Sequence, residues 1–113
     1  MRRDEVILQD IAVAREDILS FIDGMDEPAF YSDIRTQAAV QHRFLVIGEA
    51  AKRLSQELRA NHPGIQWKDA AGMRDRLVHA YEAVDLGIVW DAARNAIPCM
   101  LAAIEPMLPG PSA

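Results

Sequence analysis

An apolar stripe in the middle of the chain limits the fold more than any other feature of the sequence. Its six members follow one another at intervals of four, three, four, three and four residues: Val40, Phe44, Ile47, Ala51, Leu54 and Leu58. This spacing places all six side chains on one face of an α-helix, which turns once in about 3.6 residues. The stripe predicts a single helix over residues 33–60, which the segment from Asn61 to Gly64 ends.

Three more segments have the same periodicity, and together the four stripes predict an all-α fold. They cover residues 5–23, 67–84 and 86–107, and Pro98 should kink the last helix or start a new segment there. Segments of this length with short connections favour an antiparallel helical bundle of four long helices.

The connection after the first stripe contains the signals for a short extra helix or turn. Gly24 ends the first stripe, and Asp26 then provides an acidic cap just before Pro28. This short element would carry Phe30 and Tyr31. A chain of 113 residues fits one domain, so we expect residues 1–108 to form it and residues 109–113 to be a frayed tail.

The single cysteine and the N-terminal segment exclude several classes of protein. Cys99 has no partner for an intrachain disulfide or a multi-cysteine zinc site, and we expect it to be a small buried hydrophobe. The N-terminal segment is interrupted by charges such as Asp10 and Arg15, unlike a signal peptide or a membrane span. These features predict a cytoplasmic protein without a membrane segment.

The charge is distributed unevenly along a chain whose net charge is −5. From Arg35 to His79 there are eight Lys or Arg residues and four acidic residues, whereas the rest has four basic and thirteen acidic residues. The middle is therefore +4 and the rest −9. This distribution could provide a local phosphate site on an acidic body, although solvated helix faces would give the same pattern.

The helix predicted over residues 67–84 has a polar arc as well as a core stripe. With about 100° per residue and Arg74 at zero, Met73, Leu77, Ala80 and Val84 form the core stripe. The arc away from the core then holds Tyr81 near −20°, Val78 near 40°, Asp75 near 100° and His79 near 140°. A valine within a polar arc suits a partner surface better than open water.

Arg74 and His79 are too far apart on one helix to act as a tight pair. Their separation of about 140° could still converge on one substrate if two copies of the helix met across a twofold axis. The structural alternative is that Arg74 pairs with Asp85 or another acid and His79 with Asp75. His42 has no acid or cysteine at the spacing of metal ligands, and His62 lies in a turn before Pro63, so we expect no metal and no cofactor.

Three segments, taken in order, resemble the HEPN superfamily and more closely the HepT-like ribonuclease toxins. The segments are Ile47-Gly48-Glu49-Ala50-Ala51-Lys52-Arg53-Leu54-Ser55, then Met73-Arg74-Asp75-Arg76-Leu77-Val78-His79-Ala80-Tyr81 followed by Val84-Asp85, and finally Val89-Trp90-Asp91 leading to Ile97-Pro98. The second contains the pattern Arg-x4-His-x-Tyr that marks this group. The resemblance covers nearly the whole chain.

The resemblance implies a helical bundle that dimerises and cleaves RNA without a metal. Arg74 and His79 would be catalytic, with Asp75 and Tyr81 in support. A minimal nucleotidyltransferase antitoxin would neutralise the toxin by adding AMP to Tyr81. Two positions depart from the usual pattern, since Asp75 replaces a common Asn and Ala80 a common Gly. Neither removes a catalytic group, although Asp75 puts an acid beside the phosphate site.

The two side chains suit this chemistry, because RNA supplies its own nucleophile in the 2′-hydroxyl. His79 can move protons near neutral pH, and Arg74 can hold a phosphate through its planar fork. Two other functions stay open from the sequence. The chain could be a non-catalytic partner subunit of a minimal nucleotidyltransferase, or a plain dimerisation module whose motif fixes the helix.

Overall fold

The computed structural model describes residues 2–65, 67–79 and 85–108, and the regular structure in these ranges is entirely helical. The α-helices are α1 (Arg2–Phe21), α2 (Glu27–Tyr31), α3 (Ile34–Arg53), α4 (Gln56–Asn61), α5 (Trp67–His79), α6 (Leu86–Asp91) and α7 (Ile97–Ile104). A π-helical segment, η2 (Ala92–Ala96), joins α6 to α7, and a 3-10 turn, η3 (Glu105–Met107), follows α7. The predicted all-α class is confirmed.

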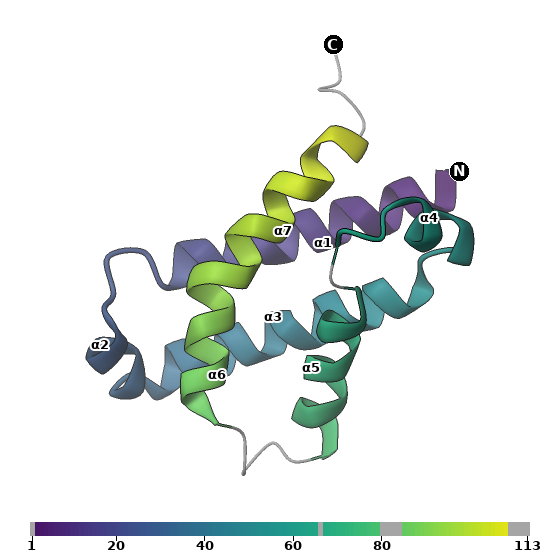
Figure 1. Ribbon diagram of the computed structural model, residues 1–113. Helices are drawn as coiled ribbons and strands as arrows, with labels where there is room; N and C mark the ends of the chain where they lie inside the picture. The colour runs from purple at the N-terminus through teal and green to yellow at the C-terminus, as the bar shows by residue number, and fades with distance from the viewer. Residues whose placement is uncertain (1, 66, 80–84, 109–113) are drawn as a thin grey trace.

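The two longest helices, α1 and α3, lie side by side and run in opposite directions (Figure 1). Helix α5 packs on α3, whereas the continuous α6–η2–α7 segment crosses the α1–α3 pair and packs mainly on α1 (Figure 1). Helix α3 therefore lies between α1 and α5. The tail residues 109–113 lie outside the described residues.

The core is built from the apolar stripes that the sequence predicts. From α1 it takes Ile7, Ile11, Ala14, Ile18 and, just after the helix, Ile22; from α3 Val40, Phe44, Ile47 and Ala51; from the C-terminal helices Val89, Ala93, Ile97 and Ile104. All are buried, and such a core is held mainly by removal of apolar surface from water. No helix among those described is long and apolar enough to cross a membrane.

The predicted helix over residues 33–60 is wrong in one respect, because it breaks after Arg53. Leu54 has an extended backbone, with ψ of 147°, and Ser55 caps the separate helix α4 by accepting a hydrogen bond from Leu58 N at 3.1 Å. Asp4 of α1 fixes this break. Its carboxylate accepts hydrogen bonds from Ser55 N at 3.0 Å and Ser55 Oγ at 2.6 Å. The two helices are therefore tied to the start of α1.

The predicted break near Pro98 is confirmed and takes the form of a π-helical segment. Ile97 N donates to Ala92 O, five residues earlier, and α7 begins at Ile97. Pro98 thus lies in the first turn of a helix, where its missing N–H removes little. Cys99 is exposed, so its prediction as a buried residue is wrong. It follows Ile97 by about 200° round the helix, which turns it away from the core.

The short element after α1 also agrees with its sequence signals. Asp26 caps α2 by accepting a hydrogen bond from Ala29 N at 2.9 Å, and Pro28 lies in the first turn. Phe30 is buried and packs near Trp90, with ring centroids 5.3 Å apart. Gly24 has φ of 76°, a left-handed conformation that explains why a glycine follows α1.

Candidate active site

Helices α3 and α5 approach each other closely at Gly48 and Arg74. A Cβ atom on Gly48 would overlap Arg74 Cβ and lie 2.7 Å from the carbonyl oxygen of Ala70. Only a glycine allows the two backbones to be this close. On the core side of α5, Leu77 is 1% exposed and Met73 is partly buried, as predicted, whereas Ala80 and Val84 lie outside the described residues.

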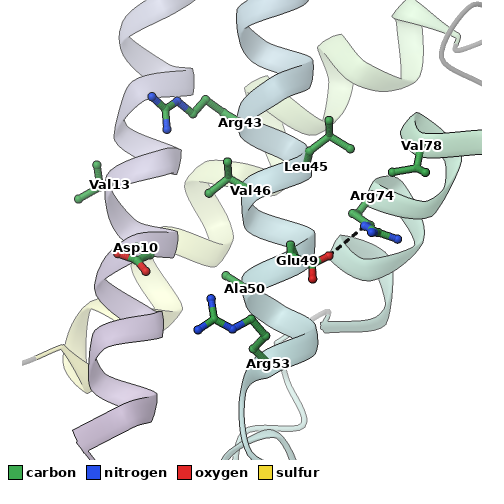
Figure 2. Close-up of a pocket in the computed structure, with 10 residues that line it drawn as sticks. All are labelled: Asp10, Val13, Arg43, Leu45, Val46, Glu49, Ala50, Arg53, Arg74 and Val78. Carbon is green, nitrogen blue, oxygen red and sulfur yellow. Dashed lines mark ion pairs between the residues drawn. The ribbon is translucent and has the colours of Figure 1, made fainter.

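Arg74 is half-buried at this contact and is held by two carboxylates, of which Figure 2 shows that of Glu49. Its Nε lies 3.1 Å from Glu49 Oε2, and its Nη1 lies 3.1 Å from Asp75 Oδ1. The partner is therefore another acid and not Asp85, which instead caps α6 by accepting a hydrogen bond from Gly87 N at 2.8 Å.

Asp75 lies between two cations, one from each helix. Its Oδ1 accepts a hydrogen bond from Lys52 Nζ at 2.5 Å as well as the one from Arg74 Nη1. These two hydrogen bonds, that of Lys52 first, lower the pKa of the Asp75 carboxyl below its ordinary value. Asp75 is therefore ionised at neutral pH. Together Glu49, Arg74, Asp75 and Lys52 form a chain of alternating charges that joins α3 to α5.

An open hollow of about 540 Å³ lies beside Arg74, on the face formed by α1, α3 and α5 (Figure 2). Apolar side chains from all three helices line it, namely Val13, Val46 and Val78. Val13 is 58% and Val78 49% exposed, so these two apolar side chains are open to solvent. The prediction that Arg74 and Val78 lie outside the intrachain core is confirmed.

Charged side chains surround these valines. Arg43 and Arg53 of α3 and Arg74 of α5 supply cations, and Asp10 of α1 and Glu49 of α3 supply carboxylates. Arg43 Nε also pairs with Asp17 Oδ2 of α1 at 3.2 Å. The face thus combines an apolar centre with charges of both signs, which is typical of a surface that binds a partner.

Of the four predicted site residues, the structure describes the side chains of Arg74 and Asp75. Arg74 and Asp75 are in contact, and the backbone of α5 is α-helical as far as His79, its last residue. A helical position five residues after Arg74 keeps the separation of about 140°. The side chain of His79 and the whole of Tyr81 lie outside the described residues, so their roles stay predictions.

Sequence reasoning gave no role to Gly48, Glu49 or Lys52, although all three contact the site. They belong to one of the segments that carries the family resemblance. From the sequence, one can see only that Glu49 and Lys52 are charged residues three apart. They lie on the same side of a helix whose core stripe holds Ile47 and Ala51. Which helix they face follows only from the packing of α5 on α3.

Comparison with known proteins places this chain in a family. The family described as "Ribonuclease HepT-like" matches residues 11–107. The chain is 38% identical over 98 residues to "Probable ribonuclease HepT" of Thermococcus cleftensis, covering 87% of this chain and 89% of the relative. It is 39% identical over 98 residues to "Putative RNase MJ0125" of Methanocaldococcus jannaschii, covering 86% and 84%. No solved structure matches the chain. The match over nearly the whole chain shows that this protein belongs to the HepT-like family of ribonucleases.

Proposed function

We propose that this chain is a metal-independent endoribonuclease toxin in which Arg74 binds the scissile phosphate and His79 transfers protons. The ribonuclease class is that of its family. The observation that carries the proposal is the position of Arg74: it is half-buried, at the rim of an open hollow, and held by carboxylates on two helices. A cation fixed in this way is suited to one phosphate group.

The reaction needs only groups that RNA and the two side chains supply. The 2′-oxygen attacks the adjacent phosphorus, and the bond from phosphorus to the 5′-oxygen breaks. An imidazole takes the 2′-proton, and the imidazolium so formed gives a proton to the leaving 5′-oxygen, which histidine can do near neutral pH. Arg74 offsets the charge that develops on the phosphate oxygens. The products are a 2′,3′-cyclic phosphate and a 5′-hydroxyl.

We further propose that two copies of the chain form the site through the face of α1, α3 and α5. Its exposed valines, Val13 and Val78, would be buried by a second copy, which gains free energy by removing apolar surface from water. A twofold axis near α5 would place Arg74 of one copy beside His79 of the other, which a separation of about 140° on one helix does not allow.

Control of this activity is proposed to act at Tyr81, through AMP added by a minimal nucleotidyltransferase antitoxin in the cytoplasm. Tyr81 follows Arg74 by seven residues, so on a continued helix it would lie about 20° from Arg74 and two turns along. The added phosphate would compete with RNA for Arg74, and the nucleoside would fill the space that RNA needs.

The proposal is tested by incubating purified protein with RNA in EDTA and comparing wild type with Arg74→Ala and His79→Ala. Wild type should cleave, and each variant should be inactive while it keeps its helicity and melting temperature. Strong dependence of the wild-type activity on a divalent metal would contradict the mechanism. Protein that cuts no RNA but is still modified at Tyr81 would indicate a non-catalytic partner subunit. Loss of folding in both variants would indicate a dimerisation module.

A further inference from the structure

The ion pair between Glu49 and Arg74 joins the proposed phosphate-binding side chain to a different helix. Glu49 Oε2 of α3 lies 3.1 Å from Arg74 Nε of α5, and the two side chains face each other across the rim of the hollow (Figure 2). Glu49 is the more exposed partner, with 55% of its side chain accessible against 28% for Arg74. The carboxylate of Glu49 therefore lies on the solvent side of the arginine.

The pairing divides the guanidinium into occupied and available nitrogen atoms. Nη1 donates a hydrogen bond to Asp75 and Nε lies in an ion pair with Glu49, whereas Nη2 has no protein partner in the part of the chain that the structure describes. Asp75 is itself fixed by Lys52 of α3. Two carboxylates thus set the orientation of the guanidinium plane, and the hydrogens on Nη2 are left for a phosphate oxygen.

We propose that Glu49 is a positioning residue for the ribonuclease reaction, which holds Arg74 in the orientation that the transition state needs. This inference rests on the proposed function. Glu49 does not touch the RNA but acts through Arg74. Its cost is electrostatic, because a carboxylate close to Arg74 opposes the approach of a phosphate. Its benefit is orientation, because an arginine fixed before RNA binds needs no reorganisation when charge develops on the phosphate.

These two effects predict that removing the charge of Glu49 lowers both KM and kcat. In Glu49→Gln the RNA should bind more tightly, so that KM falls by roughly threefold through the loss of one repelling charge. The freed arginine should be misoriented, so that kcat falls by roughly tenfold or more. A merely structural ion pair on the surface would change the melting temperature slightly and leave both kinetic constants close to those of wild type.

The matched control is Glu16→Gln, which removes the same charge from an exposed residue of α1 that does not line the hollow. The experiment measures KM and kcat on one RNA oligonucleotide for wild type, Glu49→Gln and Glu16→Gln. It also records the NMR signal of the Arg74 Nε–H group without RNA. We expect Glu49→Gln alone to lower both constants and to shift the Nε–H signal.

The outcomes separate this inference from the proposed function. If wild type cleaves RNA and Glu49→Gln has the same KM and kcat as Glu16→Gln, the positioning role is wrong while the ribonuclease function stands. An unchanged Arg74 Nε–H signal in Glu49→Gln would likewise overturn the role. If wild type cuts no RNA, the proposed function fails, whatever the NMR spectra report about the pair.

Discussion

Gly48 of α3 lies directly against Arg74 of α5, so close that a Cβ atom on Gly48 would overlap the Cβ of Arg74. Because Cβ is the root of the arginine side chain, no change of rotamer can relieve this overlap. The distance between the two helices therefore depends on the absence of a side chain at position 48. The same contact places Arg74 within reach of Glu49, the next residue of α3.

Gly48→Ala should force α5 away from α3 and weaken both the fold and the site. We expect the free energy of unfolding to fall by about 1–3 kcal/mol, as for other overpacked contacts. The matched control is Gly72→Ala, also within a helix, whose added Cβ would meet no atom within 4 Å. It should raise stability by up to about 1 kcal/mol, because alanine favours a helix. Urea unfolding of both variants tests this, and equal effects would contradict the close contact.

The hydrogen bonds from Ser55 to Asp4 should make stability depend on pH. They lower the pKa of Asp4, so the carboxylate stabilises the fold above the ordinary aspartate pKa of about 3.9. This contribution is lost as the pH falls through the lowered pKa of the folded state. Asp4→Asn should therefore cost about 1–2 kcal/mol at pH 7 and progressively less towards pH 3. Urea unfolding of wild type and variant across this range measures the difference.

The control for Asp4 is Asp23→Asn, which removes the same charge from an exposed residue beyond α1. It should show a small difference from wild type that does not follow the pH in this way. A cost for Asp4→Asn that stays constant from pH 7 to pH 3 would show that the carboxylate charge is not what fixes the start of α4.

Dimerisation should depend on the valines of the α1, α3 and α5 face. Val78→Glu places a charge in the proposed interface and should convert the dimer into a folded monomer, because Val78 lies outside the intrachain core. Ile34→Glu is the matched control, since Ile34 is 78% exposed but does not line the hollow. Sedimentation velocity at micromolar concentration should report dimers for wild type and the control. A monomeric wild type would remove the two-copy site.

Tyr81→Phe should escape neutralisation by the nucleotidyltransferase. The substitution keeps the aromatic ring and removes the oxygen that would accept AMP. Each form is co-expressed with the partner, weighed intact by mass spectrometry and assayed on RNA. Wild type should gain the mass of AMP and lose activity, whereas the variant should do neither. A variant that gains the same mass and is silenced equally would place the modification on another residue.

The sequence predicts the elements of this fold better than their ends and contacts. The stripe through Ile47 and Ala51 predicts α3 because burial follows the helical period. The same stripe continues through Leu54, so it hides the break there, which depends on Ser55 and on Asp4 at 51 residues' distance. Residues that meet through packing of two helices, such as Arg74 and Glu49, cannot be paired from spacing along either helix.

The sequence indicates Arg74 by its position in a motif and by its place in the polar arc of α5. The sequence does not indicate which acid pairs with Arg74, because Asp85 or another acid could do so. Asp85 caps α6 instead because its carboxylate reaches Gly87 N two residues later. Such local hydrogen bonds from an aspartate side chain to a nearby backbone N–H are common at the start of a helix.

We propose that two copies of α5 build each ribonuclease site of the dimer, with Arg74 from one copy and His79 from the other. It is tested by purifying mixed dimers whose two subunits bear different affinity tags. In the first, one subunit has Arg74→Ala and the other His79→Ala. In the second, a wild-type subunit is paired with one that has both substitutions.

Cleavage of one RNA oligonucleotide by these two mixed dimers is the decisive measurement. The first should keep about half of the wild-type activity, because one of its two sites still has both side chains, and the second should be inactive. The reverse result, with activity only in the second dimer, would show that each site lies within one subunit and would contradict the claim.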